Sequence, residues 1–461
     1  MPNSRKSISG LSLQSGQRLK FEIICPPDKS LTHRAIIFSS MALGKSLISN
    51  PLLGADCLAT CAAFRSLGVS IDIRNIEDGN ANVRSSIIDI DSPGVQKFHS
   101  ARNSLDFANS GTTARLLIGL FSSLEGLKVE IIGDESLSKR PMQRVVSPLR
   151  RAGAKIDGVD GGNFLPIYIE GMKLKPLAHH VDKASAQVKS ALLLAGMQIQ
   201  GLSSVRLPKG GRDHTERLLK KLGAKCSYEV IENEEIISIE GPFNVPAVNY
   251  NVPGDPSSAA FFAVLGAIVS KGEVTIKNMM TNPTRVGFVH ALERMGVSVK
   301  IIANSDHSFM EETADFSFSA PQSLSSVHIR SEELPSLIDE IPILAVAAMF
   351  AYGESCFEGL AELRVKESDR LEETKRLVIQ AGGRARIDGD NLYIQGGDIE
   401  NYGLFEYDPK GDHRLAMAAA VLAKRVGGFA FDRSKNVECV LENSDCVNVS
   451  FPNFFEILDL L

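Results

Sequence analysis

The sequence predicts an α/β protein of two domains, each built from three repeated units of the β-α-β-α-β type. One pattern of helices, glycines and strands recurs along the whole chain, and the first helix of each recurrence is apolar on nearly every side. A stretch rich in proline and glycine interrupts the pattern near the middle. Because a helix that is apolar all round belongs in a core, three units around shared central helices would form one domain, and six units form two.

The repeat is clearest where the second helix of each unit ends. A glycine follows the helix and a strand with alternating apolar residues comes next, because glycine accepts the left-handed backbone that closes a helix. Five segments share this ending: "SLGVSIDI" (66–73), "RAGAKID" (151–157), "KLGAKCSYE" (221–229), "RMGVSVKI" (294–301) and "QAGGRARID" (380–388).

The first helices are rich in small and apolar residues, as in "SSAAFFAVLGAIV" and "PILAVAAMFAY". We expect them to be buried, whereas the second helices keep one polar face. The sixth unit is cut short after "FPNFFEILDLL". The first helices are predicted to start near Thr32, Thr113, Val188, Ser257, Pro342 and His413.

The domain boundary is predicted in "NVPAVNYNVPGD" (244–255), where prolines and a glycine interrupt the pattern. An opening strand around 19–25 precedes two further prolines, so the chain is expected to cross between the domains there as well. Two hinge strands side by side would let the halves close on a ligand. The predicted domains are residues 28–251 and residues 1–27 plus 252–461, with hinges near 26–28 and 249–254.

Composition excludes several classes of function. The chain has 461 residues, of which 44% are hydrophobic and 23% charged, as is typical of a globular protein. A formal net charge of −5 argues against an extended basic surface for nucleic acid. The longest apolar run, "IPILAVAAMFAY", is shorter than the ~20 residues that span a bilayer. We expect a cytoplasmic protein with no nucleic-acid or membrane partner; a short organellar leader is the alternative.

The seven cysteines are scattered along the chain. They form no C-x-x-C pair, and the histidines form no cluster at the spacing of metal ligands. We therefore expect reduced thiols and predict no metal site.

Cations recur in the first turns of helices, where the positive end of the helix dipole makes them unfavourable by ~0.3–1 kcal/mol. A solvated helix end explains any single case, but the recurrence indicates a ligand. Helix starts gathered at one cleft would bind phosphates or carboxylates through their N–H groups and cations. The cations are Arg140, Arg212, Arg285 and Arg370 at the second helices, and Lys29, Arg34, Arg115, Lys189 and Arg414 at the first helices.

Small polar residues accompany these cations, among them Ser30. Gly111 lies between a serine and a threonine and would let a ligand approach the backbone, although this tripeptide is also a common turn. The segment "SAQVK" (185–189) is equally consistent with a helix N-cap followed by polar residues. Neither motif is specific by itself.

Two carboxylates are candidates for proton transfer. Asp339 immediately precedes a buried apolar helix, and Glu367 lies beside Lys366 in "RVKESDRL" (364–371). An acid at the entrance of a core helix is either a plain N-cap or a functional group. If both carboxylates face an anion-lined cleft, one acts as a base toward a hydroxyl and the other as an acid toward a carbon or a leaving group.

The helix after this stretch is expected to begin at about Ser368. Lys366 and Glu367 then lie in the preceding loop, and Arg370 lies in the first turn against the dipole. We expect those three side chains to point into the cleft, and Asp369 to be an ordinary solvated charge.

Six segments resemble one known family, in order and over nearly the entire chain: "PDKSLTHRA", "LDFANSGTTARLLIGL", "GDESLSKRPM", "SAQVKSALLLAG", "ELRVKESDRL" and "GDHRLAMAAA". They resemble the 5-enolpyruvylshikimate-3-phosphate (EPSP) synthases. The resemblance implies two closing domains of three βαβαββ units each, an inside-out α/β barrel. It implies transfer of the enolpyruvyl group of phosphoenolpyruvate to the 5-hydroxyl of shikimate 3-phosphate, with release of phosphate through a tetrahedral intermediate. It also implies a monomer that needs no metal or organic cofactor.

The resemblance further implies roles for individual residues. Asp339 is the base for the 5-hydroxyl, Glu367 is the acid for the methylene carbon, and Lys29 is a third catalytic residue. Around shikimate 3-phosphate it places Lys29, Ser30, Arg34, Ser185, Ala186, Gln187, Arg212, Asp339 and Lys366. Around phosphoenolpyruvate it places Lys29, Gly111, Arg140, Gln187, Arg370 and Arg414.

Three positions depart from the family pattern. Pro27 replaces a common glycine, Ala186 replaces a common serine, and Val449 stands where many members carry a lysine that contacts phosphoenolpyruvate. The segments "RDHTE", "SAQVK" and "NPTR" resemble the second class of the family, which is often tolerant of glyphosate, whereas Gly111 leaves room for that inhibitor.

Two other functions compete with this one. The sister transferase that acts on UDP-N-acetylglucosamine shares the fold and typically carries a cysteine in the loop corresponding to 133–144, where this chain has none. A non-catalytic repeat scaffold would keep the cores and glycine caps, but it would have no reason to keep Asp339, Lys366, Glu367 and Arg370 together.

Overall fold

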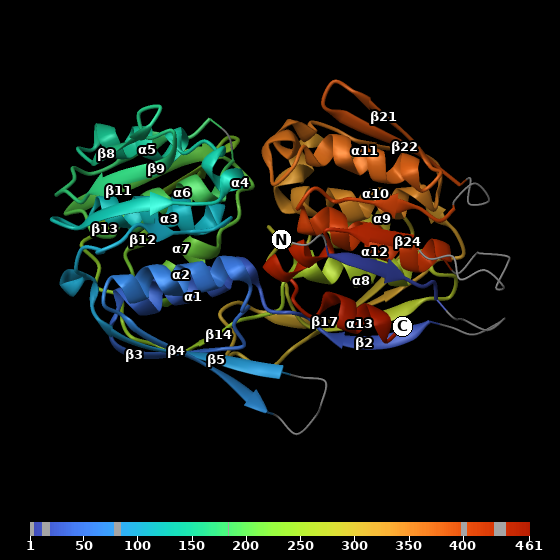
Figure 1. Cartoon of the computed structure of the whole chain (residues 1–461), viewed down its shortest axis with the longest axis horizontal. Helices are drawn as coiled ribbons and strands as arrows, with labels where there is room; N and C mark the ends of the chain where they lie inside the picture. Colours follow the sequence, from blue (N-terminus) through green and yellow to red (C-terminus); the bar gives the residue numbers. More distant parts are fainter. Residues whose placement is uncertain (1–3, 12–18, 78–83, 183, 398–402, 428–438) are drawn as a thin grey trace. The chain divides into compact units, whose positions relative to one another are not determined.

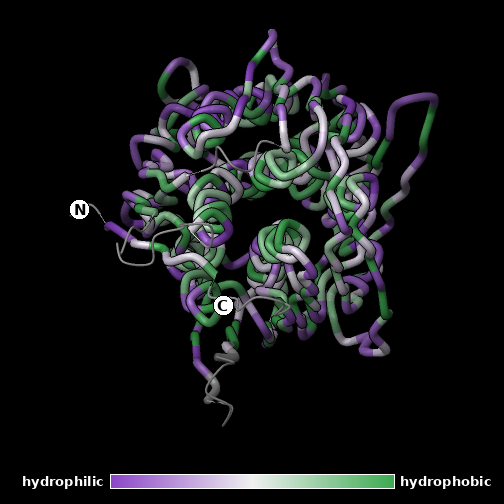
Figure 2. Tube along the Cα trace, turned by 90° about the vertical axis from the view of Figure 1, so that its right-hand side faces the viewer, coloured by the Kyte–Doolittle hydropathy of each residue, from purple (hydrophilic) through white to green (hydrophobic). Residues whose placement is uncertain are grey.

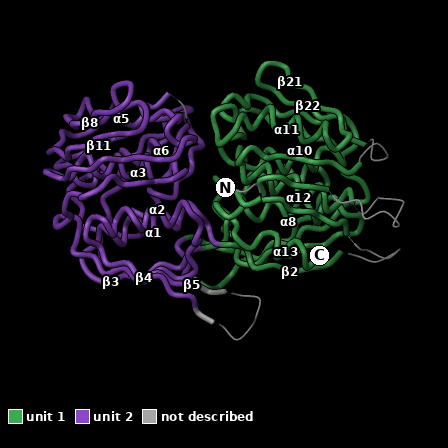
Figure 3. Tube along the Cα trace, in the orientation of Figure 1, with its two compact units in different colours: residues 1–26, 253–307, 311–461 green, residues 27–252, 308–310 purple. Residues whose placement is uncertain are grey.

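The computed structural model describes residues 4–11, 19–77, 84–182, 184–397, 403–427 and 439–461. The chain divides into two compact units (Figure 3). Unit 2 comprises Pro27–Val252 with Ser308–Met310, and unit 1 comprises Met1–Pro26, Pro253–His307 and Glu311–Leu461. No sequence pattern indicated that Ser308–Met310 belongs with unit 2, to which it is joined by the bridge between Asn251 and Phe309.

Unit 2 contains three consecutive repeats (Figure 1). Its central helices are α1 (Lys29–Met41), α3 (Gly111–Ser122) and α6 (Ala186–Gly196). Its second helices are α2 (Ala55–Ser66), α5 (Gln143–Arg151) and α7 (His214–Lys221), with the short α4 (Glu135–Ser138) before α5. Its strands are β3 (Leu43–Ser49), β4 (Ser70–Glu77), β5 (Arg84–Pro93), β6 (Leu105–Asp106), β7 (Lys128–Ile132), β8 (Lys155–Val159), β9 (Phe164–Glu170), β10 (Ala178–His180), β11 (Gly201–Pro208), β12 (Cys226–Ile231), β13 (Glu234–Gly241) and β14 (Tyr250–Asn251).

The sheets of unit 2 share one topology, with the strand orders β14-β3-β5-β4, β6-β7-β9-β8 and β10-β11-β13-β12. In each sheet the first two strands are parallel and the remaining neighbours are antiparallel. In the second and third repeats a central helix makes the parallel crossover, and the second helix leads into a hairpin. This is the repeated βαβαββ unit that was expected.

Unit 1 repeats the arrangement with the sheets β16-β17-β15-β2, β18-β20-β22-β21 and β1-β24-β23 among the described residues. Its helices are α8 (Pro256–Ile268), α9 (Gly287–Arg294), α10 (Ile341–Met349), α11 (Arg370–Gln380), α12 (His413–Val426) and α13 (Phe454–Asp459). Its 3-10 helices include η2 (Ser331–Ser336), η3 (Ile338–Glu340), η4 (Leu360–Val365) and η7 (Ser444–Val449). Its strands are β1 (Arg5–Ile8), β2 (Lys20–Ile24), β15 (Glu273–Met280), β16 (Ser298–Ala303), β17 (Thr313–Ser319), β18 (Leu324–Ser325), β19 (His328–Ile329), β20 (Ala351–Phe357), β21 (Arg384–Asp388), β22 (Asn391–Gly396), β23 (Glu406–Tyr407) and β24 (Cys439–Glu442).

Leading strands of two repeats come from distant parts of the chain. The first repeat receives β14, which pairs in parallel with β3, and the fourth repeat receives β2, which pairs in parallel with β15. The sixth repeat, which the sequence showed as cut short, is extended by β1, because β1 pairs antiparallel with β24. Apart from the short excursion of Ser308–Met310, the chain changes units at Pro26–Pro27 and at Val252–Pro253.

On the side of unit 1, the two passing segments are packed together. The backbone N–H of Asp255 donates to the carbonyl of Pro26 at 2.7 Å, and the Cys25 thiol donates to the carbonyl of Asp255 at 3.3 Å. A Cβ on Gly254 would lie 2.4 Å from the Cβ of Cys25, so only glycine fits there.

The central helices form the cores, as predicted, and every residue of α8 is buried. Figure 2 shows hydrophobic stretches along these helices. In unit 2, α3 and α6 approach so closely that a Cβ on Gly119 would lie 2.1 Å from the carbonyl oxygen of Ala191. Among the described residues, no helix combines the length and the apolar character needed to cross a membrane.

The predicted helix ends are confirmed. The capping glycines Gly68, Gly153, Gly223, Gly296 and Gly382 have φ angles of 100°, 106°, 87°, 97° and 88°. The central helices begin within three residues of the predicted starts. The start of α11 differs slightly, because Asp369 is its N-cap and accepts a hydrogen bond from the N–H of Glu372. The prediction that Asp369 is only a solvated charge was wrong.

Candidate functional site

The N-termini of several helices of unit 2 lie together. The Lys29 Nζ at the start of α1 lies 3.1 Å from an Asp56 carboxylate oxygen in the first turn of α2. The Thr113 hydroxyl at the start of α3 lies 3.4 Å from the carbonyl of Asp56. The Arg115 guanidinium of α3 donates to Gln187 Oε1 at the start of α6 at 2.7 Å. Positive helix ends therefore converge on one region of this unit.

Lys29 is positioned by the helix cap that precedes it and by its ion pair with Asp56. Asp28 precedes it as the buried N-cap of α1 and accepts a hydrogen bond from the N–H of Leu31 at 2.7 Å. The Lys29 side chain is 18% exposed and that of Asp56 is 9% exposed. The Lys29 side chain is therefore partly accessible, whereas that of Asp56 is almost covered.

Arg34 lies one turn further along α1 and is buried. Its guanidinium donates to the Thr215 hydroxyl at 2.8 Å, to the Ser190 hydroxyl at 2.8 Å and to the carbonyl of Ser30 at 3.0 Å. None of these three acceptors carries a formal charge. This arrangement ties the predicted residues Ser30 and Arg34 to the helices α6 and α7.

Two guanidinium groups surround the start of α3. A Cβ on Gly111 would lie 3.1 Å from an Arg115 nitrogen and 3.3 Å from an Arg140 nitrogen. Arg140 donates to the Asn109 amide oxygen at 2.5 Å, and Gln187 Nε2 donates to the Thr112 hydroxyl at 3.1 Å. A glycine backbone at a helix N-terminus between two arginines is suited to a phosphate or carboxylate.

The remaining predicted residues of unit 2 lie at the starts of α6 and α7. Ser185 occupies the N-cap position of α6, but its side chain makes no capping hydrogen bond. The purely capping interpretation of "SAQVK" is therefore wrong for the hydroxyl. Ala186 and Gln187 follow and are partly exposed, and Arg212 is partly exposed in the loop before α7.

In unit 1 the predicted residues gather around Arg370, the first residue of α11. Its Nε donates to an Asp412 carboxylate oxygen at 2.8 Å, one terminal nitrogen lies 2.5 Å from Glu367, and the other lies 3.4 Å from Asp339. Arg370 is 1% exposed. Burial alone would lower the pKa of Arg370, but Asp412, Glu367 and Asp339 raise it well above its ordinary value. The guanidinium is therefore a fixed positive centre that holds both predicted catalytic carboxylates.

Asp339 is also approached by the two other predicted cations of this unit. The Lys366 Nζ lies 3.8 Å from its Oδ1, and an Arg414 nitrogen lies 3.6 Å from its Oδ2. Arg414 additionally lies 3.6 Å from the buried Glu340, and Lys366 lies 3.1 Å from Glu362. Asp339 thus faces three cations and remains 14% exposed.

The two clusters differ in charge. In unit 2, Lys29, Arg34, Arg115 and Arg140 outnumber the carboxylate of Asp56 within the contacts described above. In unit 1, five carboxylates contact three cations, the carboxylates being Asp339, Glu340, Glu362, Glu367 and Asp412. The first cluster is therefore suited to binding anions, and the second is suited to moving protons.

Comparison with known proteins decides the family. The profile of the family described as EPSP synthase (3-phosphoshikimate 1-carboxyvinyltransferase) matches residues 13–458. This chain belongs to the EPSP synthase family.

Individual relatives of the EPSP synthase family agree over nearly their whole length. The chain is 38% identical over 438 residues to a 3-phosphoshikimate 1-carboxyvinyltransferase of Bacillus cytotoxicus, covering 95% of this chain and 96% of the relative. It is 40% identical over 439 residues to the protein of the same name from Shouchella clausii, again covering 95% and 96%. A solved structure of EPSP synthase from Acinetobacter baumannii superposes with a TM-score of 0.80 at 33% identity, covering 99% of this chain and 98% of that one.

Two cations that were expected at the anion site form buried ion pairs inside the units instead. Lys189 is fully buried and lies 2.5 Å from Glu216 and 3.1 Å from Glu235. Burial would lower the pKa of Lys189, but the two carboxylates more than reverse this and raise it. Arg285 lies 2.7 Å from the buried Asp255, the N-cap of α8. The prediction that these two helix-start cations belong to the anion site was wrong.

The alternative role of Asp339 as a plain N-cap is also wrong. The N-cap of α10 is Glu340, and Asp339 lies in the preceding 3-10 helix η3. Asp412, Asn109 and Asp56 were not predicted from the sequence as site residues. The signal for Asp412 was present, because the acid stands just before the helix that carries Arg414.

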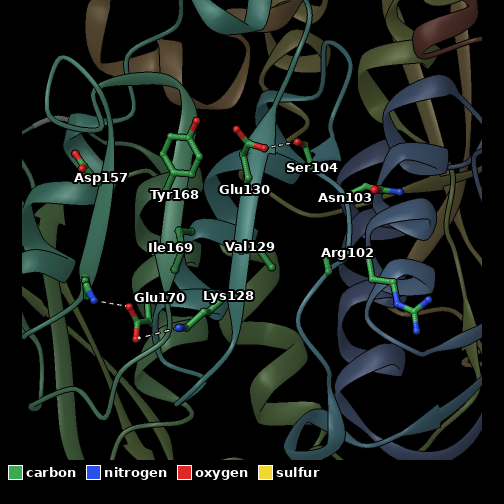
Figure 4. Close-up of a pocket in the computed structure, with 12 residues that line it drawn as sticks. Arg102, Asn103, Ser104, Lys128, Val129, Glu130, Asp157, Tyr168, Ile169 and Glu170 are labelled. Carbon is green, nitrogen blue, oxygen red and sulfur yellow. Dashed lines mark hydrogen bonds and ion pairs between the residues drawn. The ribbon is translucent and has the colours of Figure 1, made fainter.

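A separate hollow of about 640 Å³ lies on the exposed face of the sheet β6-β7-β9-β8 (Figure 4). It contains none of the predicted site residues. Two of its lysines, Lys155 and Lys128, pair with Glu170, and Ser104 donates to Glu130. We interpret this hollow as a solvated sheet face and assign it no role in the reaction.

Proposed function

We propose that this chain transfers the enolpyruvyl group of phosphoenolpyruvate to the 5-hydroxyl of shikimate 3-phosphate and releases phosphate. Family membership supports this activity. The observation that carries the assignment of roles is the Arg370 guanidinium, which holds Asp339 and Glu367 at once. One fixed side chain thereby positions a candidate base and a candidate acid.

The proposed reaction begins with proton transfer from Glu367 to the methylene carbon of phosphoenolpyruvate. The neighbouring carbon becomes electrophilic, and the 5-hydroxyl oxygen adds to it while its proton passes to Asp339. In the resulting tetrahedral intermediate the bond from this carbon to the phosphate oxygen breaks and phosphate leaves. Loss of a proton from the methyl group to Glu367 then restores the double bond.

The anion-binding residues are proposed from both clusters. For shikimate 3-phosphate they are Lys29, Ser30, Arg34, Ser185, Ala186, Gln187, Arg212 and Lys366, together with the base Asp339. For phosphoenolpyruvate they are Lys29, Gly111, Arg140, Gln187, Arg370 and Arg414. Since Arg370 is almost fully buried, direct contact with phosphoenolpyruvate requires Glu367 or Asp339 to release one of its nitrogens.

The proposal places the acid and the base in unit 1 and most of the anion ligands in unit 2. Activity is therefore expected only from a chain that contains both units. Charge supports this division, because phosphate-bearing substrates are attracted to the cationic cluster of unit 2 and repelled by excess carboxylates.

A phosphate-release assay tests the function. The purified chain is given phosphoenolpyruvate with shikimate 3-phosphate, and in parallel phosphoenolpyruvate with UDP-N-acetylglucosamine. We expect turnover only with shikimate 3-phosphate. Turnover only with the UDP-sugar would assign the sister activity, and no turnover with either would support a scaffold.

We also propose that the protein is a cytoplasmic monomer of the second class of the family. Light scattering on a size-exclusion column tests the monomer, for which the mass expected from the composition is 49.9 kDa. Inhibition by glyphosate, measured against phosphoenolpyruvate, tests the class.

A further inference from the structure

A group of side chains that the proposed reaction does not use lies beside β20 in unit 1. His328 in β19, Cys356 in β20 and Glu358 just after β20 each offer one ligand atom, and these atoms all lie within 4.8 Å of one another. We propose that His328, Cys356 and Glu358 form a binding site for a divalent transition metal ion of the zinc type. The site does not depend on the function proposed above.

Strand pairing explains why the three side chains meet. β19 and β20 are parallel, with His328 opposite Cys356 and Ile329 opposite Phe357. Ile329 and Phe357 are fully buried in the core. Because side chains alternate along a strand, His328, Cys356 and Glu358 all point to the outer face.

The backbone on both sides of this group is fixed. The N–H of Cys356 donates to the carbonyl of Val327 at 2.9 Å, and the N–H of Glu358 donates to the carbonyl of Ile329 at 2.9 Å. These bonds bracket His328 and set its register against β20. The ligand geometry therefore rests on a sheet, and sites on strands are held more accurately than sites on loops.

The three groups match the chemistry of zinc. Imidazole nitrogen, thiolate sulfur and carboxylate oxygen are its usual ligands, and three protein ligands leave a fourth position for water. His328 Nε2 and a Glu358 carboxylate oxygen already lie 2.7 Å apart. A metal ion would take the place of the proton that they share. The His328 side chain is 55% exposed, so an ion can enter from solvent.

Neighbouring side chains form an outer shell. Tyr393 lies opposite Cys356 on β22 and makes a side-chain hydrogen bond with it. The Arg386 guanidinium stacks on the Tyr393 ring at 3.7 Å, and an Arg294 nitrogen donates to the carbonyl of His328 at 3.2 Å. Such outer-shell contacts orient the ligands of a metal site.

A metal ion bound by His328, Cys356 and Glu358 would connect two segments that lead to the proposed catalytic residues. The chain runs from β19 through η2 to η3, which carries Asp339, and from Glu358 through η4 to Lys366 and Glu367. A metal bound by His328 and Glu358 would therefore join the starts of both segments. Because binding to the folded state alone stabilises it, the melting temperature should rise with metal concentration.

The test is a calorimetric titration of the full chain, reduced and treated with EDTA, with Zn²⁺. Co²⁺ serves as a spectroscopic probe, because a thiolate ligand gives a sulfur-to-cobalt charge-transfer band. We expect one ion per chain and such a band. Loss of a direct ligand in Cys356→Ser or His328→Asn should weaken binding about 100-fold or more, since loss of an outer-shell partner alone costs ~10–100-fold.

Two matched variants serve as controls. Cys226→Ser removes another partly exposed thiol, and His180→Asn removes a histidine whose Nε2 also lies 2.7 Å from a carboxylate, that of Glu234. Both should bind Zn²⁺ like the wild type. Circular dichroism without metal shows whether each variant is folded. The proposal is overturned if the wild type shows no saturable binding, if the Co²⁺ complex has no thiolate band, or if folded Cys356→Ser and His328→Asn bind as tightly as the wild type.

Discussion

At the scale of single residues, Arg370 sets the distance between the proposed acid and base. Its three nitrogens contact Asp339, Glu367 and Asp412, and the last of these is itself the N-cap of α12. A planar guanidinium can hold three carboxylates in fixed directions, whereas a lysine ammonium is a point charge on a flexible stem. In the proposed reaction, the positions of the acid and the base thus depend on one side chain that is anchored to a helix start.

The first prediction concerns the two carboxylates. Glu367→Gln and Asp339→Asn should each lower kcat by ~10²–10⁴-fold, because each removes one proton-transfer group. Phosphate release with saturating substrates measures this. Glu362→Gln is the matched control, since Glu362 also contacts Lys366, at 3.1 Å, but is assigned no proton transfer. Wild-type turnover in either Glu367→Gln or Asp339→Asn would contradict the mechanism.

The second prediction concerns Gly111. In Gly111→Ala the new methyl group would lie 3.1 Å and 3.3 Å from the guanidinium nitrogens of Arg115 and Arg140, so it occupies the space proposed for phosphoenolpyruvate. We expect KM for phosphoenolpyruvate to rise about tenfold or more, equal to ~1.4 kcal/mol of lost binding, while KM for shikimate 3-phosphate changes less. Gly403→Ala, where a Cβ meets no atom within 4 Å, should leave both KM values unchanged.

At the scale of elements, α1 contains a titratable group between its two candidate ligands Lys29 and Arg34. His33 is fully buried, its Nδ1 lies 2.8 Å from the Thr60 hydroxyl, and burial lowers its pKa to about 4. The unfolded chain takes up this proton below about pH 6.5, whereas the folded chain takes it up only near pH 4. Stability should therefore fall as the pH drops through this window.

The third prediction is the size of that effect. Between pH 6.5 and 4, His33 should cost the wild type ~3 kcal/mol of unfolding free energy, and His33→Gln should lose this part of the slope. Urea unfolding at a series of pH values measures it. His290→Gln, which changes an exposed histidine, should keep the wild-type slope. An unchanged slope in His33→Gln would show that the histidine does not contribute.

Helices and strands were predictable from the sequence where neighbouring residues alone determine them. The glycine caps, the apolar central helices and the alternating strands follow from backbone conformation and burial, and these hold in the structure. Strand pairing across long stretches of chain was not predictable in detail, because the two-residue strand β14 carries too short a pattern to reveal its partner β3.

The candidate site was predictable in its residue types and only partly in its contacts. The recurrence of cations at helix starts indicated an anion site, but it could not separate Arg34, held by hydroxyls, from Lys189, neutralised by Glu216 and Glu235. Glu216 and Glu235 lie in other elements, α7 and β13, so the sequence around Lys189 does not indicate that they contact it. The His328, Cys356 and Glu358 group was missed because the whole of α10 separates the first ligand from the others.

At the scale of the whole molecule, the two units differ in how much of the chain each needs to complete its sheets. Unit 2 is almost entirely contained in residues 27–252, including β14. Unit 1 needs β2 and β1 from the start of the chain, which pair with β15 and β24. Without them, the buried apolar side chains of Ile8, Leu19 and Ile23 are missing from its core.

The fourth prediction follows from this inequality. A fragment of residues 27–252 should fold and unfold cooperatively, whereas a fragment of residues 253–461 should not. Joining residues 1–26 to the second fragment through a flexible linker should restore cooperative unfolding. Thermal circular dichroism measures all three. Cooperative unfolding of residues 253–461 alone would show that β1 and β2 are dispensable.

The pairing of β2 with β15 also has a consequence during synthesis. A ribosome adds ~5–20 residues per second, so β2 waits on the order of tens of seconds before its partner strand emerges. During this time the apolar residues Phe21 and Ile23 have no sheet to join. Unit 2 can close first, once β14 has emerged, and the nascent N-terminal segment stays exposed until the following repeat appears. The strand β2 is therefore where we expect a chaperone to bind the growing chain.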